Sequence, residues 1–95
     1  MVSLNRTAIW GGASKGVIFA LFRERTGHPV NKVIDINPAK QGRYLPGTGL
    51  QVESPAQGIS DLQKGSTIYV MNSNYLEEIK QMSNNDFNYI GIDYE

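Results

Sequence analysis

Short runs of β-favouring apolar residues alternate with longer segments of helical periodicity along this chain. Residues 7–10 form the first such run, which stops at two glycines. Residues 15–26 follow with apolar side chains at helical spacing, and Gly27 stands where a helix would end. We therefore expect a buried first strand and then an amphipathic helix. The apolar residues of the expected inner face of this helix are Val17, Ile18, Leu21 and Phe22.

The same alternation continues to the end of the chain. Ser54 and Pro55 have the pattern of a helix N-cap followed by proline at the first helical position, which predicts a short helix to about Leu62. The segment from 39 to 49 is rich in glycine, proline and basic residues and predicts a loop. Further strands are predicted at residues 31–36, 50–52, 67–71 and 88–92, and a further helix at residues 75–82.

The order of these elements indicates the fold class. Strands that alternate with helices at this spacing favour a parallel sheet with helices on both faces. A chain of 95 residues is of the size that forms one hydrophobic core. We therefore predict one α/β domain over residues 1–95, a small Rossmann-like, three-layer domain with a mostly parallel five-stranded sheet.

Composition narrows the classes of function. Nine basic and nine acidic side chains give a net charge of zero without a basic cluster, so we expect no nucleic-acid partner. The chain has no cysteine and a single histidine, His28, so we expect no disulfide and no metal site. The longest apolar run, residues 17–22, is too short to span a bilayer, and residues 1–6 lack the core of a signal peptide. We expect a soluble, cytoplasmic protein without a membrane partner.

The turn after the first strand is a candidate anion-binding loop. It matches the pattern G-x-G-x-x-G at Gly11 and Gly16 but has Ala13 in place of the middle glycine, which lets a pyrophosphate approach the backbone. This departure weakens the case for a dinucleotide. The following helix still offers free N–H groups and a positive dipole end to an anion. The candidate binding residues here are Gly11, Gly12, Ala13, Ser14, Lys15 and Gly16.

Asp35 lies nineteen residues after Gly16, at the end of the second predicted strand. A carboxylate in this place binds ribose in dinucleotide-binding folds. Two interpretations stand beside each other. The glycine turn and Asp35 bind a nucleotide, or the glycines serve only the turn and Asp35 caps a turn with Asn37 and Pro38.

Five segments carry a resemblance to a known family. They are GASKG at residues 12–16, VIDINP at 33–38, KQGRYLPGT at 40–48, SP at 54–55 and VMNSNY at 70–75. Together they resemble the C-terminal domain of S-adenosylmethionine-dependent sugar C-methyltransferases over residues 7–95. The run at 40–48 is the specific part of this resemblance, because a glycine turn alone occurs in many folds.

The resemblance implies a role within a larger enzyme. Members of that family methylate a carbon of nucleotide-linked keto-deoxysugars, and they have a zinc-binding N-terminal region, a central S-adenosylmethionine domain and a Rossmann-like C-terminal domain. The catalytic residues and the S-adenosylmethionine site would then lie in the central domain. This chain would be a non-catalytic module that binds a nucleotide or sugar nucleotide, with the catalytic methyltransferase domain as its partner. We expect no methyl transfer by the isolated chain.

The loop after Asp35 and the segment after the fourth predicted strand supply the remaining candidates. Lys40 and Arg43 can pair with phosphates, and Tyr44 can stack on a base or sugar; the alternative is a basic surface loop. Asn72, Asn74 and Tyr75 can hydrogen-bond a sugar or a partner domain; the alternative is that they cap a helix. The candidates outside the glycine turn are Asp35, Asn37, Lys40, Arg43, Tyr44 and Asn72.

Two other functions remain open from the sequence. One is a purely structural module that packs against the catalytic domain of the same enzyme. The other is a free-standing dinucleotide-binding domain with a regulatory or oxidoreductase role, although no candidate acid–base pair is visible in the sequence.

Overall fold

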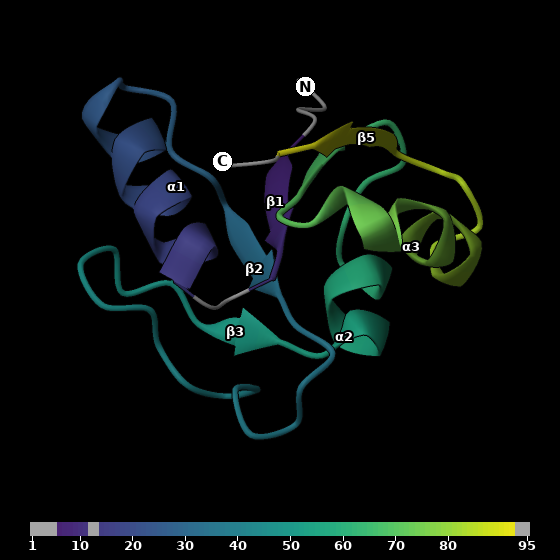
Figure 1. The fold of residues 1–95 in the computed structure, drawn as a ribbon, viewed down its shortest axis with the longest axis horizontal. Coiled ribbons are helices and arrows are strands. Elements are labelled where there is room, and N and C mark those ends of the chain that lie inside the picture. The colour runs from purple at the N-terminus through teal and green to yellow at the C-terminus, as the bar shows by residue number, and fades with distance from the viewer. Residues whose placement is uncertain (1–5, 12–13, 93–95) are drawn as a thin grey trace.

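The computed structural model describes residues 6–11 and 14–92, and within them five strands form one sheet. All strand pairs are parallel, in the order β3-β2-β1-β4-β5 (Figure 1). The predicted parallel α/β architecture is therefore confirmed. The strands are β1 (Thr7–Trp10), β2 (Lys32–Ile34), β3 (Val52–Glu53), β4 (Thr67–Val70) and β5 (Asn88–Gly91). The helices are α1 (Ser14–Arg25), α2 (Pro55–Ser60) and α3 (Leu76–Met82), with the 3-10 turn η1 (Ser73–Tyr75) before α3.

The helices cover the two faces of the sheet unequally. In Figure 1, α1 lies on one side of the sheet and α2 and α3 lie on the other. Side chains alternate along each strand to meet these layers. Ala8 and Trp10 of β1 pack in the cluster of α2 and α3, whereas Ile9 packs with Phe19 and Ala20 of α1. The core is thus two apolar layers, one on each face of the sheet.

The inner face of α1 differs from the one predicted. Phe19 and Ala20 are buried, but Ile18 and Phe22 are 61% and 60% exposed. The predicted face was therefore wrong for Ile18 and Phe22. The close approach of Gly16 to the first strand, described below, explains the difference, because Phe19 and Ala20 lie three and four positions after Gly16 and share its face.

The helix ends follow the signals in the sequence. The N–H of His28 donates to the Arg23 carbonyl and that of Gly27 to the Glu24 carbonyl, with Gly27 at φ +82°, which is a Schellman motif. At α2, Ser54 Oγ accepts from the Gln57 N–H at 3.3 Å. This helix ends at Ser60, two residues before the predicted end.

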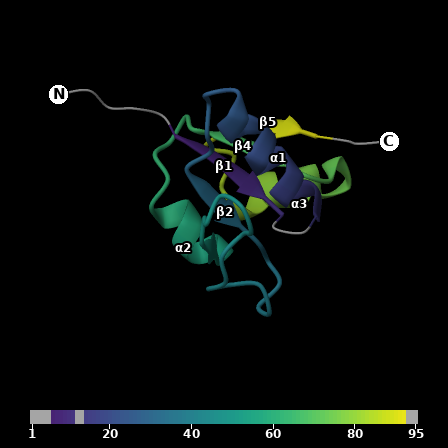
Figure 2. The same ribbon diagram turned by 90° about the vertical axis from the view of Figure 1, so that its left-hand side faces the viewer.

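The connection between β2 and β3 is a long loop with internal structure. Residues 50–52 were predicted as a strand, but β3 is only Val52–Glu53, and Gln51 instead forms an antiparallel bridge with Tyr44. The N–H of Leu45 donates to the Leu50 carbonyl at 2.8 Å, and Leu45 is buried in the α1 layer. Figures 1 and 2 show this loop extending from the lower end of the sheet.

Candidate functional site

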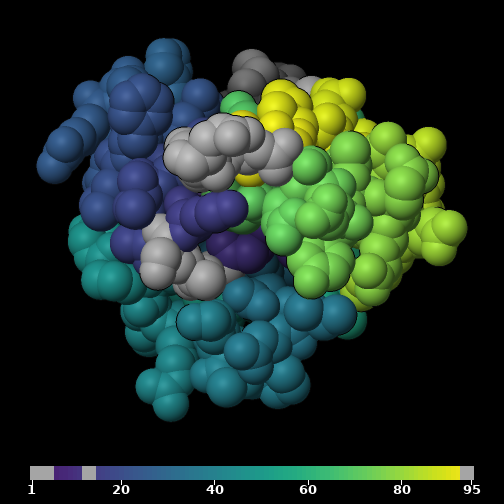
Figure 3. Space-filling model, in the orientation of Figure 1, coloured from purple at the N-terminus to yellow at the C-terminus, as the bar shows by residue number. Residues whose placement is uncertain are grey.

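A cavity of about 520 Å³ opens at the carboxyl edge of the sheet, beside the ends of β1 and β4. The chain leaves β1 towards α1 on one face and leaves β4 towards α3 on the other, which is the topological switch point where open α/β sheets bind ligands. The surface is hollowed between the green residues of α3 and the blue residues that follow β2 (Figure 3). The lining residues are Trp10, Gly11, Lys15, Gly16, Asp35, Ile36, Val70, Met71, Asn72, Tyr75, Glu78, Ile79 and Met82.

Gly11 and Gly16 shape one end of this cavity. Gly11 has φ +120°, a conformation that disfavours other residues, and a Cβ there would lie 3.1 Å from Met71 Cβ. A Cβ on Gly16 would lie 2.0 Å from the Gly11 carbonyl oxygen. The first glycine therefore makes the turn, and the last lets α1 pack closely against it. Both roles are those that the first and last glycines have in the pattern G-x-G-x-x-G. Gly12 and Ala13 lie outside the described residues.

Asp35 lies directly after β2 and lines the cavity with only 8% of its surface exposed. Its Oδ1 accepts a hydrogen bond from the Asn37 N–H at 2.9 Å. The predicted cap of a turn at Asn37 is thus present. The carboxylate still belongs to the cavity wall, and an ionised carboxylate accepts several hydrogen bonds at once. Capping and ligand binding are therefore compatible roles for Asp35.

The loop that contains the KQGRYLPGT run is hydrogen-bonded to the backbone of Asp35. Gln41 Nε2 donates to the backbone carbonyl of Asp35 at 2.9 Å. Arg43 accepts from the Val52 N–H through its carbonyl at 2.8 Å, and its Nε donates to the Ala39 carbonyl at 3.0 Å. The loop is therefore hydrogen-bonded to the two strands at this edge of the sheet.

Several predicted site residues do not line the cavity. Asn37, Lys40, Arg43 and Tyr44 are absent from its wall, and Tyr44 is 66% exposed. Asn72 does line it, while its Oδ1 also accepts from the Asn74 N–H at 3.0 Å. Of the twelve predicted positions, the structure gathers around the cavity Gly11, Lys15, Gly16, Asp35 and Asn72. The side chain of Ser14 is outside the described part of the structure, but Ser14 is the first residue of α1.

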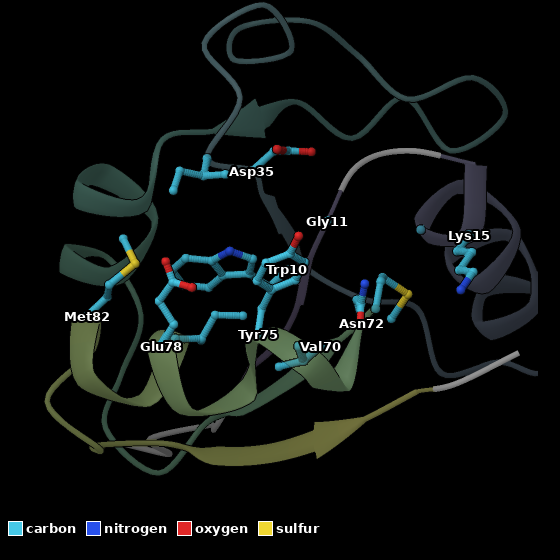
Figure 4. Close-up of a pocket in the computed structure, with 13 residues that line it drawn as sticks. Trp10, Gly11, Lys15, Asp35, Val70, Asn72, Tyr75, Glu78 and Met82 are labelled. Carbon is cyan, nitrogen blue, oxygen red and sulfur yellow. The ribbon is translucent and has the colours of Figure 1, made fainter.

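Residues of η1 and α3 build a further wall, in which Tyr75 was a candidate from the sequence and Glu78 and Met82 were not. Tyr75, Glu78 and Met82 face Asp35 across the cavity, with Trp10 and Gly11 between them (Figure 4). Their spacing of three and four residues places them on one helical face. Trp10 is 7% exposed and is part of the hydrophobic core. It also lines the cavity. The spacing of these residues in the sequence predicts that they share a helix face, but nothing in the sequence indicates that this face lines a cavity.

The part of the chain that the structure describes contains neither a cluster of metal ligands nor a membrane-spanning helix. No group of three or more His, Cys, Asp or Glu side chains there is placed to hold a metal ion. None of the described helices has the length and apolar character needed to cross a membrane.

Comparison with protein families identifies the family of this chain. Residues 3–91 match the family described as the C-methyltransferase C-terminal domain. The chain belongs to this family. The match covers all elements of the sheet and includes the glycine turn, Asp35 and the 40–48 loop of this C-methyltransferase C-terminal domain. No curated protein matches its sequence significantly.

Solved structures with a similar fold include a repressor. The crystal structure of RSP, a Rex-family repressor, superposes with a TM-score of 0.65 at 11% identity, covering 95% of this chain and 53% of that one. RSP in complex with β-NAD⁺ and operator DNA gives a TM-score of 0.60 at 13% identity, covering 93% and 50%. The C-methyltransferase C-terminal domain therefore spans about half the length of these chains and shares their fold.

Proposed function

We propose that this domain is a non-catalytic module of an S-adenosylmethionine-dependent sugar C-methyltransferase, and that it binds a nucleotide or sugar nucleotide in the cavity. The observation that carries the proposal is the position of the cavity at the switch point between β1 and β4, with the glycine turn at one end and Asp35 in its wall. The N-terminus of α1 and Lys15 would receive phosphate, and Asp35 would accept from a sugar hydroxyl.

The dimensions and chemistry of the cavity support this proposal. A volume of about 520 Å³ lies within the range of small-molecule sites, which are mostly apolar with a few polar groups. Trp10, Val70 and Ile79 supply the apolar surface, and Lys15, Asp35 and Asn72 supply polar groups. RSP, which shares the fold, was solved in complex with β-NAD⁺ and operator DNA, and this makes a nucleotide the first class of ligand to test.

Catalysis would lie elsewhere in the parent enzyme. The methyl donor would be held by a separate catalytic domain, which is the partner that the family description suggests. We assign no step of methyl transfer to this chain.

One observation favours a second candidate function. Ile18 and Phe22 form an exposed apolar pair on the outer face of α1, away from the sheet. Such a pair would suit a module that packs against the catalytic domain and serves mainly as support. The two functions differ in one measurable property, because only the first requires the cavity to bind a ligand.

An NMR titration of the labelled 95-residue chain with thymidine diphosphate, NAD⁺ and S-adenosylmethionine tests the proposal. We expect shifts of the amides around Gly11, Gly16 and Asp35 with a nucleotide. Lys15→Ala should weaken binding about tenfold to a hundredfold, because a charge-assisted hydrogen bond contributes about 1.5–3 kcal/mol. Absence of binding by all three compounds would favour the structural module.

Arg43→Ala is the matched control for this experiment. It removes a cation that does not line the cavity, so affinity should stay at the level of the unaltered chain. A loss of affinity equal to that of Lys15→Ala would extend the ligand to the 40–48 loop.

A further inference from the structure

The 40–48 loop contacts both of the elements that would hold a nucleotide, although none of its residues lines the cavity. Near its end, a Cβ on Gly47 would lie 2.5 Å from Leu21 Cδ2 of α1. Near its start, Gln41 Nε2 donates to the Asp35 carbonyl at 2.9 Å, in a partly buried hydrogen bond. The loop therefore joins the helix that would receive phosphate to the carboxylate that would accept from a sugar hydroxyl.

The Asp35 carbonyl lies where the parallel ladder between β2 and β3 lacks a donor. The N–H of Asp35 donates to the Glu53 carbonyl at 3.1 Å, which continues the ladder past the pair of Ile34 and Glu53. In a parallel ladder the next donor, to the Asp35 carbonyl, would be the N–H of residue 55. That residue is Pro55, which has no N–H. The side-chain amide of Gln41 supplies a donor in its place.

The hydrogen bond from Gln41 also bears on the direction of the Asp35 carboxylate. Oδ1 of Asp35 accepts from the Asn37 N–H at 2.9 Å, so the carboxylate is held by backbone that lies two residues further on. The peptide between Asp35 and Ile36 sets the course of that backbone. Gln41 holds the carbonyl of this peptide, and it thereby fixes both the main chain and the side chain of Asp35 at the cavity wall.

We propose that Gln41 is a positioning residue, which keeps the Asp35 carboxylate directed at a sugar hydroxyl of the nucleotide while making no contact with the ligand itself. This inference rests on the proposed function of the cavity and deepens it. It requires only a sugar hydroxyl, which thymidine diphosphate and NAD⁺ both carry, and it gives the 40–48 loop a part in binding from outside the cavity.

The test is a double-mutant cycle measured by calorimetric titration of the 95-residue chain with thymidine diphosphate and with NAD⁺. Gln41→Met removes the donor and keeps a side chain of similar length. It should raise the dissociation constant about threefold to tenfold, the effect of one hydrogen bond. In the Asp35→Asn background the same change should have almost no effect, because the carboxylate that Gln41 positions is gone. A role in stability alone would give no such coupling in the affinity.

Gln51→Met is the matched control, since Gln51 Nε2 donates to the Gly42 carbonyl at 3.2 Å in the same loop but does not contact Asp35. Its affinity should equal that of the unaltered chain. Amide NMR spectra check the fold of each variant, and Gln41→Ala is a second variant from which we expect the same loss of affinity as from Gln41→Met.

Three results would overturn the positioning role while leaving nucleotide binding intact. They are an unchanged affinity of Gln41→Met, an equal loss in the Asp35→Asn background, and the same loss in Gln51→Met. Unfolding of both Gln41 variants would show that this amide holds the fold, and would overturn the role as well. Failure of the unaltered chain to bind either nucleotide would instead overturn the function of the cavity, and the role of Gln41 with it.

Discussion

Gly16 is the residue whose replacement has the most direct structural consequence. Any side chain at this position would overlap the Gly11 carbonyl, with only 2.0 Å between that oxygen and a Cβ. The obstacle is backbone, which cannot rotate away as a side chain can. The position therefore controls how closely the first turn of α1 approaches the end of β1.

We predict that Gly16→Ala destabilises the domain although alanine favours helix more than glycine by about 1 kcal/mol. Overpacking typically costs about 1–3 kcal/mol, and the net loss should lower Tm by several degrees in a chain of this size. Urea or thermal unfolding measures the effect. Lys15→Ala is the control in the same turn, because Lys15 is exposed and its truncation should leave Tm nearly unchanged. A Gly16→Ala variant as stable as the original would show that α1 does not approach Gly11 so closely.

Single residues also show what the sequence could and could not predict about the site. Gly11 and Asp35 follow directly after strands and Asn72 lies two residues after one, so the parallel topology alone brings them to one edge of the sheet. Gly16 lies in the first turn of the helix that follows β1. Glu78 is the third residue of α3. Its position depends on the rotation of α3 about its axis, which packing against the sheet determines.

At the scale of elements, the regular strands and helices were predicted well and their ends less so. The strand at residues 31–36 is only Lys32–Ile34, because Asp35 turns the chain through its bond to Asn37 and Pro38 follows. The spacing of apolar residues did not predict which face of α1 is buried. The close contact of Gly16 with Gly11 determines the rotation of the helix, and the number of apolar residues on a face does not. A close backbone approach of this kind becomes visible only when strand and helix are placed together.

The 40–48 loop has an ordered structure that is held by backbone hydrogen bonds, and hydrogen exchange tests this order. We predict that the amides of Gly42, Leu45 and Val52 exchange slowly, because each donates a backbone hydrogen bond of 2.8 Å that joins residues 42–45 to residues 50–52. The amide of Tyr44 should exchange fast. Tyr44 lies opposite Gln51, between those hydrogen bonds, and its own N–H makes no hydrogen bond within the described residues. Uniformly fast exchange of the loop amides would contradict an ordered, hydrogen-bonded loop next to Asp35.

At the scale of the whole molecule, the exposed pair on α1 bears on the proposed packing of this domain against a catalytic domain. We predict that the double change Ile18→Asn and Phe22→Asn leaves the Tm of the 95-residue chain within a few degrees, because exposed positions usually alter stability by about 0.5 kcal/mol or less. In the C-methyltransferase that carries the domain, the same change should reduce methyl transfer if this face packs on the catalytic part.

Glu24→Gln, an exposed change on the same helix, is the control for that experiment. Unaltered methyl transfer by the Ile18 and Phe22 variant in the full enzyme would rule this face out as the docking surface. A large fall in the Tm of the isolated chain would instead show that the pair supports the fold itself.

The central place of β1 has a consequence for how the protein is made. Within this domain β1 is synthesised before its neighbour β4, and Arg6 and Ser66 meet across 60 positions of sequence. Parallel strands cannot be joined by a tight hairpin, and contacts between distant parts of a chain form slowly. During synthesis β1, β2 and β3 can assemble with α1 while the other edge of β1 has no strand beside it. Until β4 arrives, the nascent chain carries an open strand edge of the kind on which aggregation begins and which chaperones cover.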